Sequence, residues 1–282
     1  MDSIFKYVRH VIYCLLTMSF STSILADQKL PVWELGLGAS VFSFPDYPGS
    51  NEQNTLVLPF PHIIYRGEFF QINQRELVKP LFEKSNLEVS LSLSGSIPVS
   101  SKDNKIREGM DNLDGTIGVG PVLKYQLFKQ GLNNLQFEVP IRAQMAATFT
   151  RLSPVGWDIN PGIYYFVRKN SGPHQRAKVS MGVSARFATE ENHNYFYGVS
   201  TKDERLGRPA YQSSGGFSGM NYSLGFDMHF KKLWFGGFWR VQDMSQTAFK
   251  DSPLVETYFS HIFGLSLTWN FYQSKETVSG LE

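Results

Sequence analysis

Several segments of this sequence alternate between polar and apolar residues. The charged residues that could act together lie at the polar positions of these segments. Side chains at every second position of an extended chain share one face, so that face would carry both signs of charge. Paired charges would hold a wet interior together, whereas unpaired bases would favour a selective anion path. Glu138 and Arg142 lie on one face of a single segment, which favours pairing. The residues predicted to share this interior face are Glu88, Lys124, Glu138, Arg142, Lys178, Arg186, Asp227, His229 and Arg240.

Hydrolytic chemistry would need a nucleophile, a base and an acid. His229 and His261 lie in alternating segments and serines are abundant, but the sequence contains no Gly-x-Ser-x-Gly elbow and no assignable Ser-His-acid set. The histidines show no metal-ligand spacing, and the only cysteine is Cys14. We therefore expect no enzyme, no metal and no cofactor. A hydrolase of the outer membrane is the least favoured of three functions.

The elements that must position these residues are β-strands. From Tyr258 to Phe271, six of the seven odd-numbered residues are apolar, and most even-numbered residues are small or polar. A period of two predicts a strand with one apolar and one polar face. The same alternation recurs at 87–97, 117–127, 135–145, 177–187 and 218–230.

The strands are numerous enough to form a membrane barrel. No later run reaches the ~20 apolar residues of a spanning helix, so only a closed antiparallel barrel would carry this chain across a bilayer. Lys231-Lys232 and 128–132 predict short turns at one end, and 98–113 and 190–215 predict long loops at the other, as in outer-membrane barrels. With a further strand at 74–83, the barrel would have twelve strands. The alternative is a barrel of ten strands, if 55–74 is one bent strand. The other candidates are 32–43, 55–65, 68–74, 87–97, 114–127, 133–148, 155–168, 177–189, 216–230, 232–247 and 258–271.

The amino terminus predicts export. Residues 1–26 begin with basic residues, continue with the apolar stretch Val11–Phe20 and end at Ala26, a plausible cleavage point for a signal peptide. The apolar stretch is too short for a membrane anchor. The remaining chain has no cysteine and nearly balanced charge, which argues against a nucleic-acid partner.

Four motifs between residues 33 and 67 carry a family resemblance. The chain reads Trp33-Glu-Leu-Gly-Leu-Gly38, Pro45-Asp-Tyr-Pro-Gly-Ser50, Leu58-Pro-Phe-Pro-His62 and Tyr65-Arg-Gly67. This order resembles the MltA-interacting protein / OmpV family of Gram-negative outer-membrane proteins, and Tyr195-Phe-Tyr-Gly-Val199 is similar to another family segment. The resemblance implies an outer-membrane location. It also implies, from the best-studied members, a scaffold that docks a lytic transglycosylase near a murein synthase.

The motif Pro45–Ser50 has two readings. Its prolines and glycine are typical of a rigid turn, and a binding loop is the alternative. If the loop binds a partner, Asp46 and Tyr47 are the candidate contacts. The strand order places this loop on the outer side, so a periplasmic partner would bind elsewhere.

The carboxyl end of the barrel carries the expected assembly signal. The resemblance implies that Trp269 and Phe271 present aromatic side chains to the barrel-assembly machinery and to outer-membrane lipid. We expect the barrel to span 27–271 and residues 272–282 to form a flexible periplasmic tail. The favoured function is a scaffold for murein-remodelling enzymes, and the alternative is a narrow channel for small solutes.

Overall fold

The structure is a computed structural model that describes residues 29–66, 71–72, 81–148, 150–170 and 175–279. The predicted signal peptide, residues 1–26, lies outside the described residues. Most of the predicted strands 68–74 and 74–83 lie outside them too.

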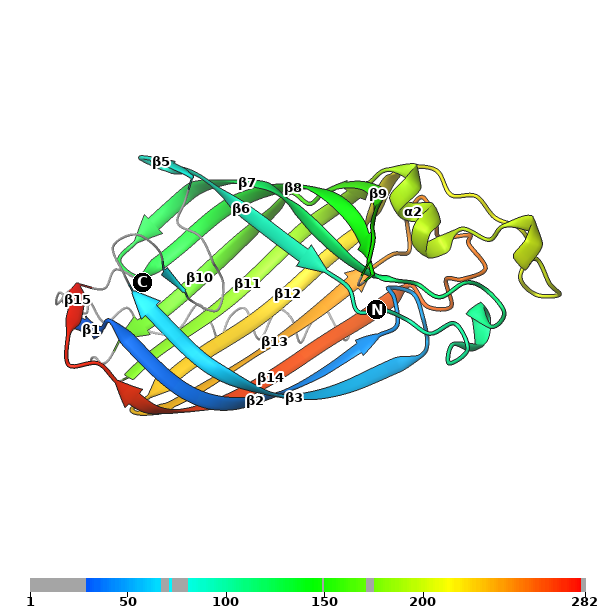
Figure 1. Cartoon of the computed structure of the whole chain (residues 1–282). Coiled ribbons are helices and arrows are strands. Elements are labelled where there is room, and N and C mark those ends of the chain that lie inside the picture. Colours follow the sequence, from blue (N-terminus) through cyan, green and yellow to red (C-terminus); the bar gives the residue numbers. More distant parts are fainter. Residues whose placement is uncertain (1–28, 67–70, 73–80, 149, 171–174, 280–282) are drawn as a thin grey trace, which may run out of the picture.

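One antiparallel sheet of 13 strands dominates the described chain and curls into a barrel (Figure 1). Twelve strands follow one hydrogen-bonded path, in the order β4-β3-β2-β14-β13-β12-β11-β10-β8-β7-β6-β5, and β9 pairs with β8 and β11 beside it. The prediction of twelve antiparallel strands is confirmed. The strands are β2 (Trp33–Pro45), β3 (Gln53–Arg66), β4 (Gln71–Ile72), β5 (Phe82–Lys84), β6 (Leu87–Gly95), β7 (Gly115–Gln130), β8 (Asn133–Ala147), β9 (Leu152–Ile159), β10 (Gly162–Asn170), β11 (Gln175–Ala188), β12 (Gly216–Phe230), β13 (Leu233–Asp243) and β14 (Phe259–Gln273).

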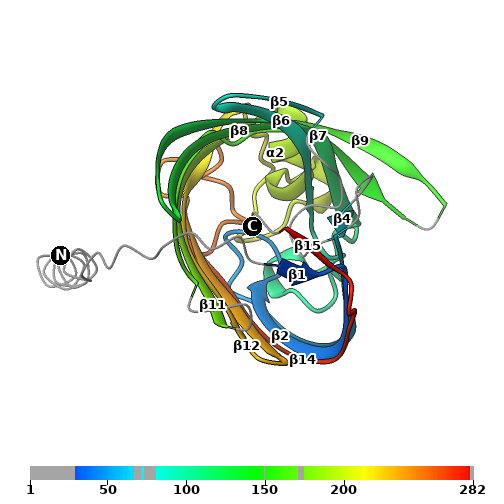
Figure 2. The ribbon, with the colours of Figure 1, turned by 90° about the vertical axis from the view of Figure 1, so that its left-hand side faces the viewer.

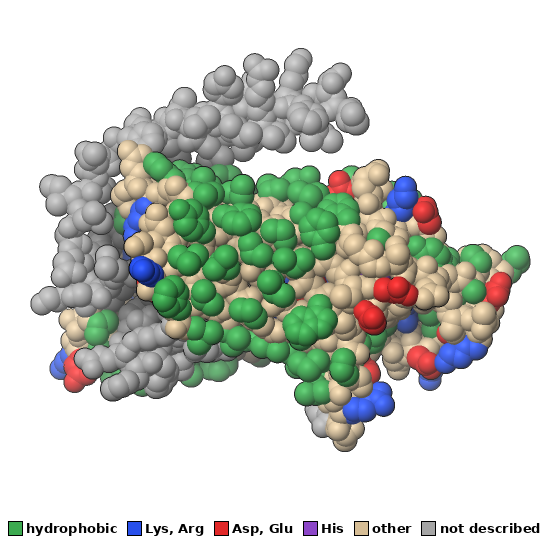
Figure 3. All heavy atoms as spheres, turned by 90° about the horizontal axis from the view of Figure 1, so that it is seen from above, with side chains coloured by type: hydrophobic (Ala, Val, Ile, Leu, Met, Phe, Trp, Pro, Cys, Tyr) green, Lys and Arg blue, Asp and Glu red, His purple; other side chains and the backbone are tan. Residues whose placement is uncertain are grey.

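Along much of its wall the barrel is apolar outside and polar inside, as β12 shows. On β12, Tyr222, Leu224 and Met228 are exposed, whereas the alternate positions Ser223 and Asp227 face inward. Figure 3 shows hydrophobic side chains covering the middle of one face of the barrel, with charged groups gathered towards the ends. A soluble sandwich would bury its apolar face, so this inversion indicates a sheet solvated by lipid. The described strands therefore have the surface of a transmembrane β-barrel.

The two ends of the barrel differ in the length of their connections. Two-residue turns, Gly131-Leu132 and Lys231-Lys232, join β7 to β8 and β12 to β13 at one end. The loops 46–52, 96–114, 189–215 and 244–258 all lie at the other end, where they carry the helix α2 (Glu190–Tyr197). In the end-on view, α2 lies within the outline of the barrel (Figure 2). Within the described segments, no helix has the length and apolar composition to span a bilayer.

The predicted strand 155–168 is broken in the structure. β9 ends at Ile159 and β10 begins at Gly162, and both occupy the same place between β8 and β11. Pro161 explains the break, because proline has no N–H to donate to the ladder. β9 pairs with the second half of β8, and Asp158 lies opposite Arg142 in that ladder.

The predicted flexible tail is wrong over its first eight residues. β14 continues to Gln273, and β15 (Thr277–Ser279) pairs antiparallel with β1 (Lys29–Pro31) at the short-turn end. Ser274 joins the two segments further, because its N–H donates to the Trp33 carbonyl and its hydroxyl accepts from the Trp33 N–H. The polar sequence of 272–282 gave no sign of this pairing. A short strand that is held by backbone hydrogen bonds does not need an alternating apolar pattern.

Candidate functional site

The motif loop Pro45–Ser50 is an internal part of the structure. Tyr47 is 2% exposed, and its hydroxyl donates to the Leu254 carbonyl at 2.9 Å. Asp46 accepts hydrogen bonds from the side chains of Asn54 and Asn104. Gly49 adopts φ +98°, a left-handed conformation that favours glycine. Asp46 and Tyr47 therefore act as contacts within the chain, which supports the rigid-turn reading of the loop.

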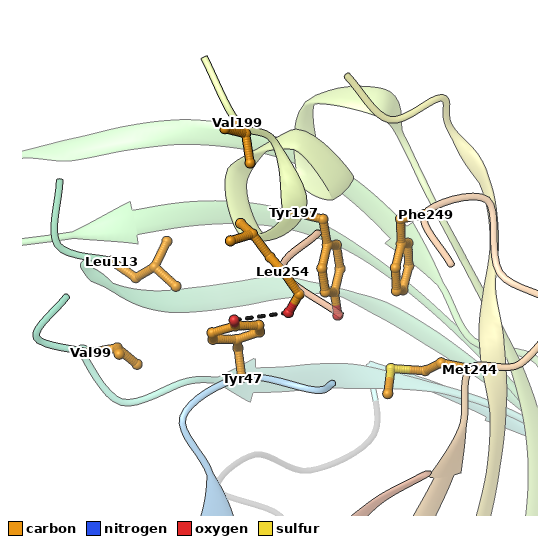
Figure 4. Packing of buried hydrophobic residues seen from close by; sticks show 8 residues of the cluster. All are labelled: Tyr47, Val99, Leu113, Tyr197, Val199, Met244, Phe249 and Leu254. Atoms are coloured by element: carbon orange, nitrogen blue, oxygen red, sulfur yellow. Dashed lines mark hydrogen bonds between the residues drawn. The ribbon is translucent and has the colours of Figure 1, made fainter. Parts of the chain in front are cut away.

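This loop belongs to a packed cap, which we define as the loops 46–52, 96–114, 189–215 and 244–258. Side chains from all four loops form one buried apolar cluster (Figure 4). The Tyr197 and Phe249 rings stack at 3.7 Å, and Tyr197 also donates to the Pro48 carbonyl. Because the loops come from opposite sides of the barrel, the cluster joins them across the mouth. Its members are Tyr47, Val99, Leu113, Tyr197, Val199, Met244, Phe249 and Leu254.

Two buried arginines tie the loops of the cap together. Arg107 lies over the Tyr47 ring and donates to the carbonyls of Phe196 and Asp111. Arg208 donates to the carbonyls of Ile106, Glu108 and Asp203. Burial lowers the pKa of Arg107 and raises that of Tyr47, because each charged form loses hydration. These arginines are bound mainly to backbone oxygens, so they fix the loop conformations.

A histidine–serine pair lies at the base of the cap. His193 on α2 is hydrogen-bonded through Nε2 to Ser218 Oγ at 2.6 Å and through Nδ1 to the Ser214 carbonyl at 2.7 Å. Such a contact could activate a serine nucleophile. However, His193 and Ser218 are each 1% exposed, so a substrate could not reach them in this conformation. We assign the pair to the packing of the cap.

The main ionic network of the lumen centres on Asp158. Arg142 donates to both of its carboxylate oxygens, at 2.7 and 3.2 Å, and Arg186 Nε reaches Oδ2 at 3.3 Å. Gln144 donates to the same carboxylate, and Arg186 also reaches Asn192 on α2. Arg142 therefore pairs with Asp158, and the expected pairing with Glu138 is wrong. Sequence analysis missed Asp158 because it lies beside the unrecognised break in the strand.

The other predicted interior residues also lie on the face that points away from lipid. Lys124 pairs with Glu88 at 2.8 Å, and Asp227 contacts His229 and accepts a hydrogen bond from Trp234. Lys178 lies over the Phe166 ring at 4.5 Å. Glu138 lies opposite Lys124 in the β7–β8 ladder. Most charges in the lumen are therefore compensated.

Arg240 and His261 occupy opposite faces of the barrel wall. Arg240 points into the lumen, where Tyr164 and Arg142 are near. His261 lies on the outer face and stacks on Trp239, with ring centroids 6.1 Å apart. Across the described residues, no group of three histidine, cysteine or acidic side chains is arranged to hold a metal ion.

The aromatic residues at the end of β14 lie on the outer surface. Trp269 and Phe271 are exposed, and their rings pack edge to face with centroids 6.0 Å apart. This position fits an aromatic girdle at the membrane interface. That the barrel-assembly machinery recognises these two rings stays a prediction.

Comparison with known proteins gives one family and several distant folds. The family model "MltA-interacting protein MipA" matches residues 37–271. No curated protein sequence matches the chain. Among solved structures, the chain is similar to "CymD monoaromatic hydrocarbon channel" (12% identity, 86% of this chain and 68% of that one, TM-score 0.26). It is also similar to a Pseudomonas aeruginosa FadL homologue (12% identity, 88% of this chain and 91% of that one, TM-score 0.25). A porin is similar too (9% identity, 84% of this chain and 100% of that one, TM-score 0.24). TM-scores this low support no functional argument.

Proposed function

Because this chain belongs to the MltA-interacting protein MipA family, we propose that it is a membrane-anchored scaffold. In this role the barrel holds a lytic transglycosylase, and with it a murein synthase, at the inner surface of the outer membrane. The packed cap carries the proposal. Four loops share one buried cluster across the long-loop mouth, whereas a general porin needs an open path.

The charges of the lumen support the same function. Asp158 neutralises Arg142 and Arg186, and Glu88 pairs with Lys124. Paired charges stabilise a barrel interior, whereas an anion channel would keep a row of free bases along its path. The lumen therefore fits an anchor better than a general solute path.

The short-turn end offers the surface for a periplasmic partner. Among the described residues, its exposed charged side chains are mostly lysines, and Glu83 and Glu276 are the exposed acids. The pair β1–β15 lies at the same end. A partner with an acidic surface would find complementary charge there. In the part of this end that the structure describes, the exposed lysines are Lys84, Lys129, Lys169, Lys231, Lys232 and Lys275.

Co-purification tests the scaffold. The full-length protein is captured from detergent-solubilised, cross-linked envelopes, and the bound proteins are identified by mass spectrometry. We expect a lytic transglycosylase and a murein synthase above the background of an unrelated barrel. The double variant Lys231→Glu/Lys232→Glu should capture less of both, with Asp111→Lys in the cap as the control for charge reversal. Failure of the intact protein to enrich either enzyme would refute the scaffold.

A further inference from the structure

One side of the lumen has an apolar wall. Phe42 and Phe238 face inward from β2 and β13, with their ring centroids 6.4 Å apart. Both rings lie against Gly264, where a Cβ would meet Phe238 Cε1 at 2.6 Å and Phe42 Cδ1 at 2.9 Å. The rings therefore lie along the wall. The apolar wall consists of Phe42, Leu56, Leu58, Phe60, Phe238 and Ile262.

Part of this wall is uncovered. Leu58 lies opposite the inward-facing Ser40, yet 43% of Leu58 is exposed, and Phe238 is 36% exposed. Apolar surface in contact with water is less stable than the same surface buried against an apolar group. Inward-facing leucine and phenylalanine would gain stability from an apolar group placed over them.

A cation lies beside the wall. Arg240 follows Phe238 by two residues on the same face of β13 and lies in register with Ile262 and Ser223. Arg240 is exposed, and the ion pairs and hydrogen bonds within the described part of the chain do not include it. Arg142 is near but is already bound to Asp158, and Tyr164 brings a phenol to the same region. This leaves one uncompensated positive charge at the edge of an apolar surface.

We propose that the lumen binds a small amphipathic anion, with its carboxylate on Arg240 and its apolar body over Phe42, Leu58 and Phe238. Arginine binds carboxylates through two parallel hydrogen bonds, which fixes the direction of the head group. The Tyr164 phenol lies in the same region, where its hydroxyl is hydrogen-bonded to Ser184. Most other charges of the lumen are neutralised within the wall, so the site selects an anion at this place. The site extends beyond the proposed scaffold role and does not depend on it.

Equilibrium dialysis with the full-length protein in phospholipid nanodiscs tests the site. The probes are phenylbutyrate, phenylbutylamine and butyrate, and empty nanodiscs provide the blank for partition into lipid. We expect phenylbutyrate to bind the protein at least about tenfold more tightly than either other probe, because only this probe satisfies both the cation and the wall. Equal binding of phenylbutylamine, or of butyrate, would overturn the proposal.

Variants separate the two halves of the site. Arg240→Gln should weaken phenylbutyrate binding about tenfold or more, since a charged hydrogen-bond pair is lost. Arg240→Lys should retain part of the affinity, and Lys102→Gln, an exposed lysine of the cap, should retain all of it. Leu58→Asn and Phe238→Leu should weaken phenylbutyrate and leave butyrate unchanged. Heat-modifiable migration on a gel confirms that each variant folds, and wild-type affinity in a folded Arg240→Gln would refute the site.

Discussion

Tyr197 at the end of α2 and Phe249 in the loop after β13 stack with their ring planes 7° apart and their centroids 3.7 Å apart. The two residues belong to different loops, so their contact fixes the relative position of those loops. Tyr197 also donates to the Pro48 carbonyl, and Ser252 donates to the Tyr197 carbonyl. Tyr197 is therefore the point at which three of the four loops of the cap meet.

Removing one partner of this stack should loosen the cap. Phe249→Ala deletes a fully buried ring, a change that typically costs ~3–5 kcal/mol. The barrel itself should persist, because its ladder does not depend on this ring. Limited trypsin digestion of the protein in nanodiscs should then cut after Arg107, which is buried in the intact cap. Phe259→Ala, on the exposed outer face, serves as the control and should show no new cleavage.

Acid should loosen the cap through His193. Burial lowers its pKa below the ordinary value of ~6.5, opposed by the hydrogen bond to the Ser214 carbonyl, and nearby Arg186 lowers it further. A depressed folded-state pKa gives stability that is present above the unfolded-state pKa and is lost as pH falls through the folded-state value. Trypsin sensitivity should therefore rise below about pH 6.5. His193→Gln should flatten this profile, whereas His261→Gln should leave it unchanged; a profile that survives His193→Gln would assign the transition to another group.

Asp158 should be needed for stability. Asp158→Asn leaves Arg142 and Arg186 without their buried counterion, a loss of ~3–5 kcal/mol for a broken buried pair. Urea unfolding of the barrel in nanodiscs should show a clearly lower midpoint. Asp111→Asn breaks an exposed pair with Lys202 and should change the midpoint little. Equal midpoints for the two variants would show that the lumen network adds no stability.

The chain should tolerate truncation only after the last residue of β14 that pairs with β2. Tyr272 and Gln273 still pair with Leu35 and Glu34 of β2. A chain ending at Phe271 should therefore assemble less well than one ending at Ser274, as measured by the heat-modifiable fraction in outer membranes. Trp269→Ala and Phe271→Ala in the full chain should lower the same fraction. Equal assembly of the two truncated chains would show that the barrel ends at Phe271.

The alternation of polarity predicted most of the barrel. A period of two locates β6, β7, β8, β11, β12 and β14 and assigns their faces, because lipid favours apolar side chains on the outer side. It could not predict that Arg142 pairs with Asp158, since that contact depends on register and on the bend before Pro161. The cap was less predictable still, because Tyr47, Arg107, Tyr197 and Phe249 converge from four separate loops. The pairing of β1 with β15 depends on backbone hydrogen bonds, which the types of the side chains do not reveal.

Conductance of the pure protein in planar lipid bilayers tests the central claim, that the barrel is a capped anchor, most directly. The buried cluster across the long-loop mouth predicts no large, stable current steps from the intact protein. Phe249→Ala, recorded under the same conditions, should give more frequent small openings. Large and stable steps from the intact protein would contradict the account and establish a channel.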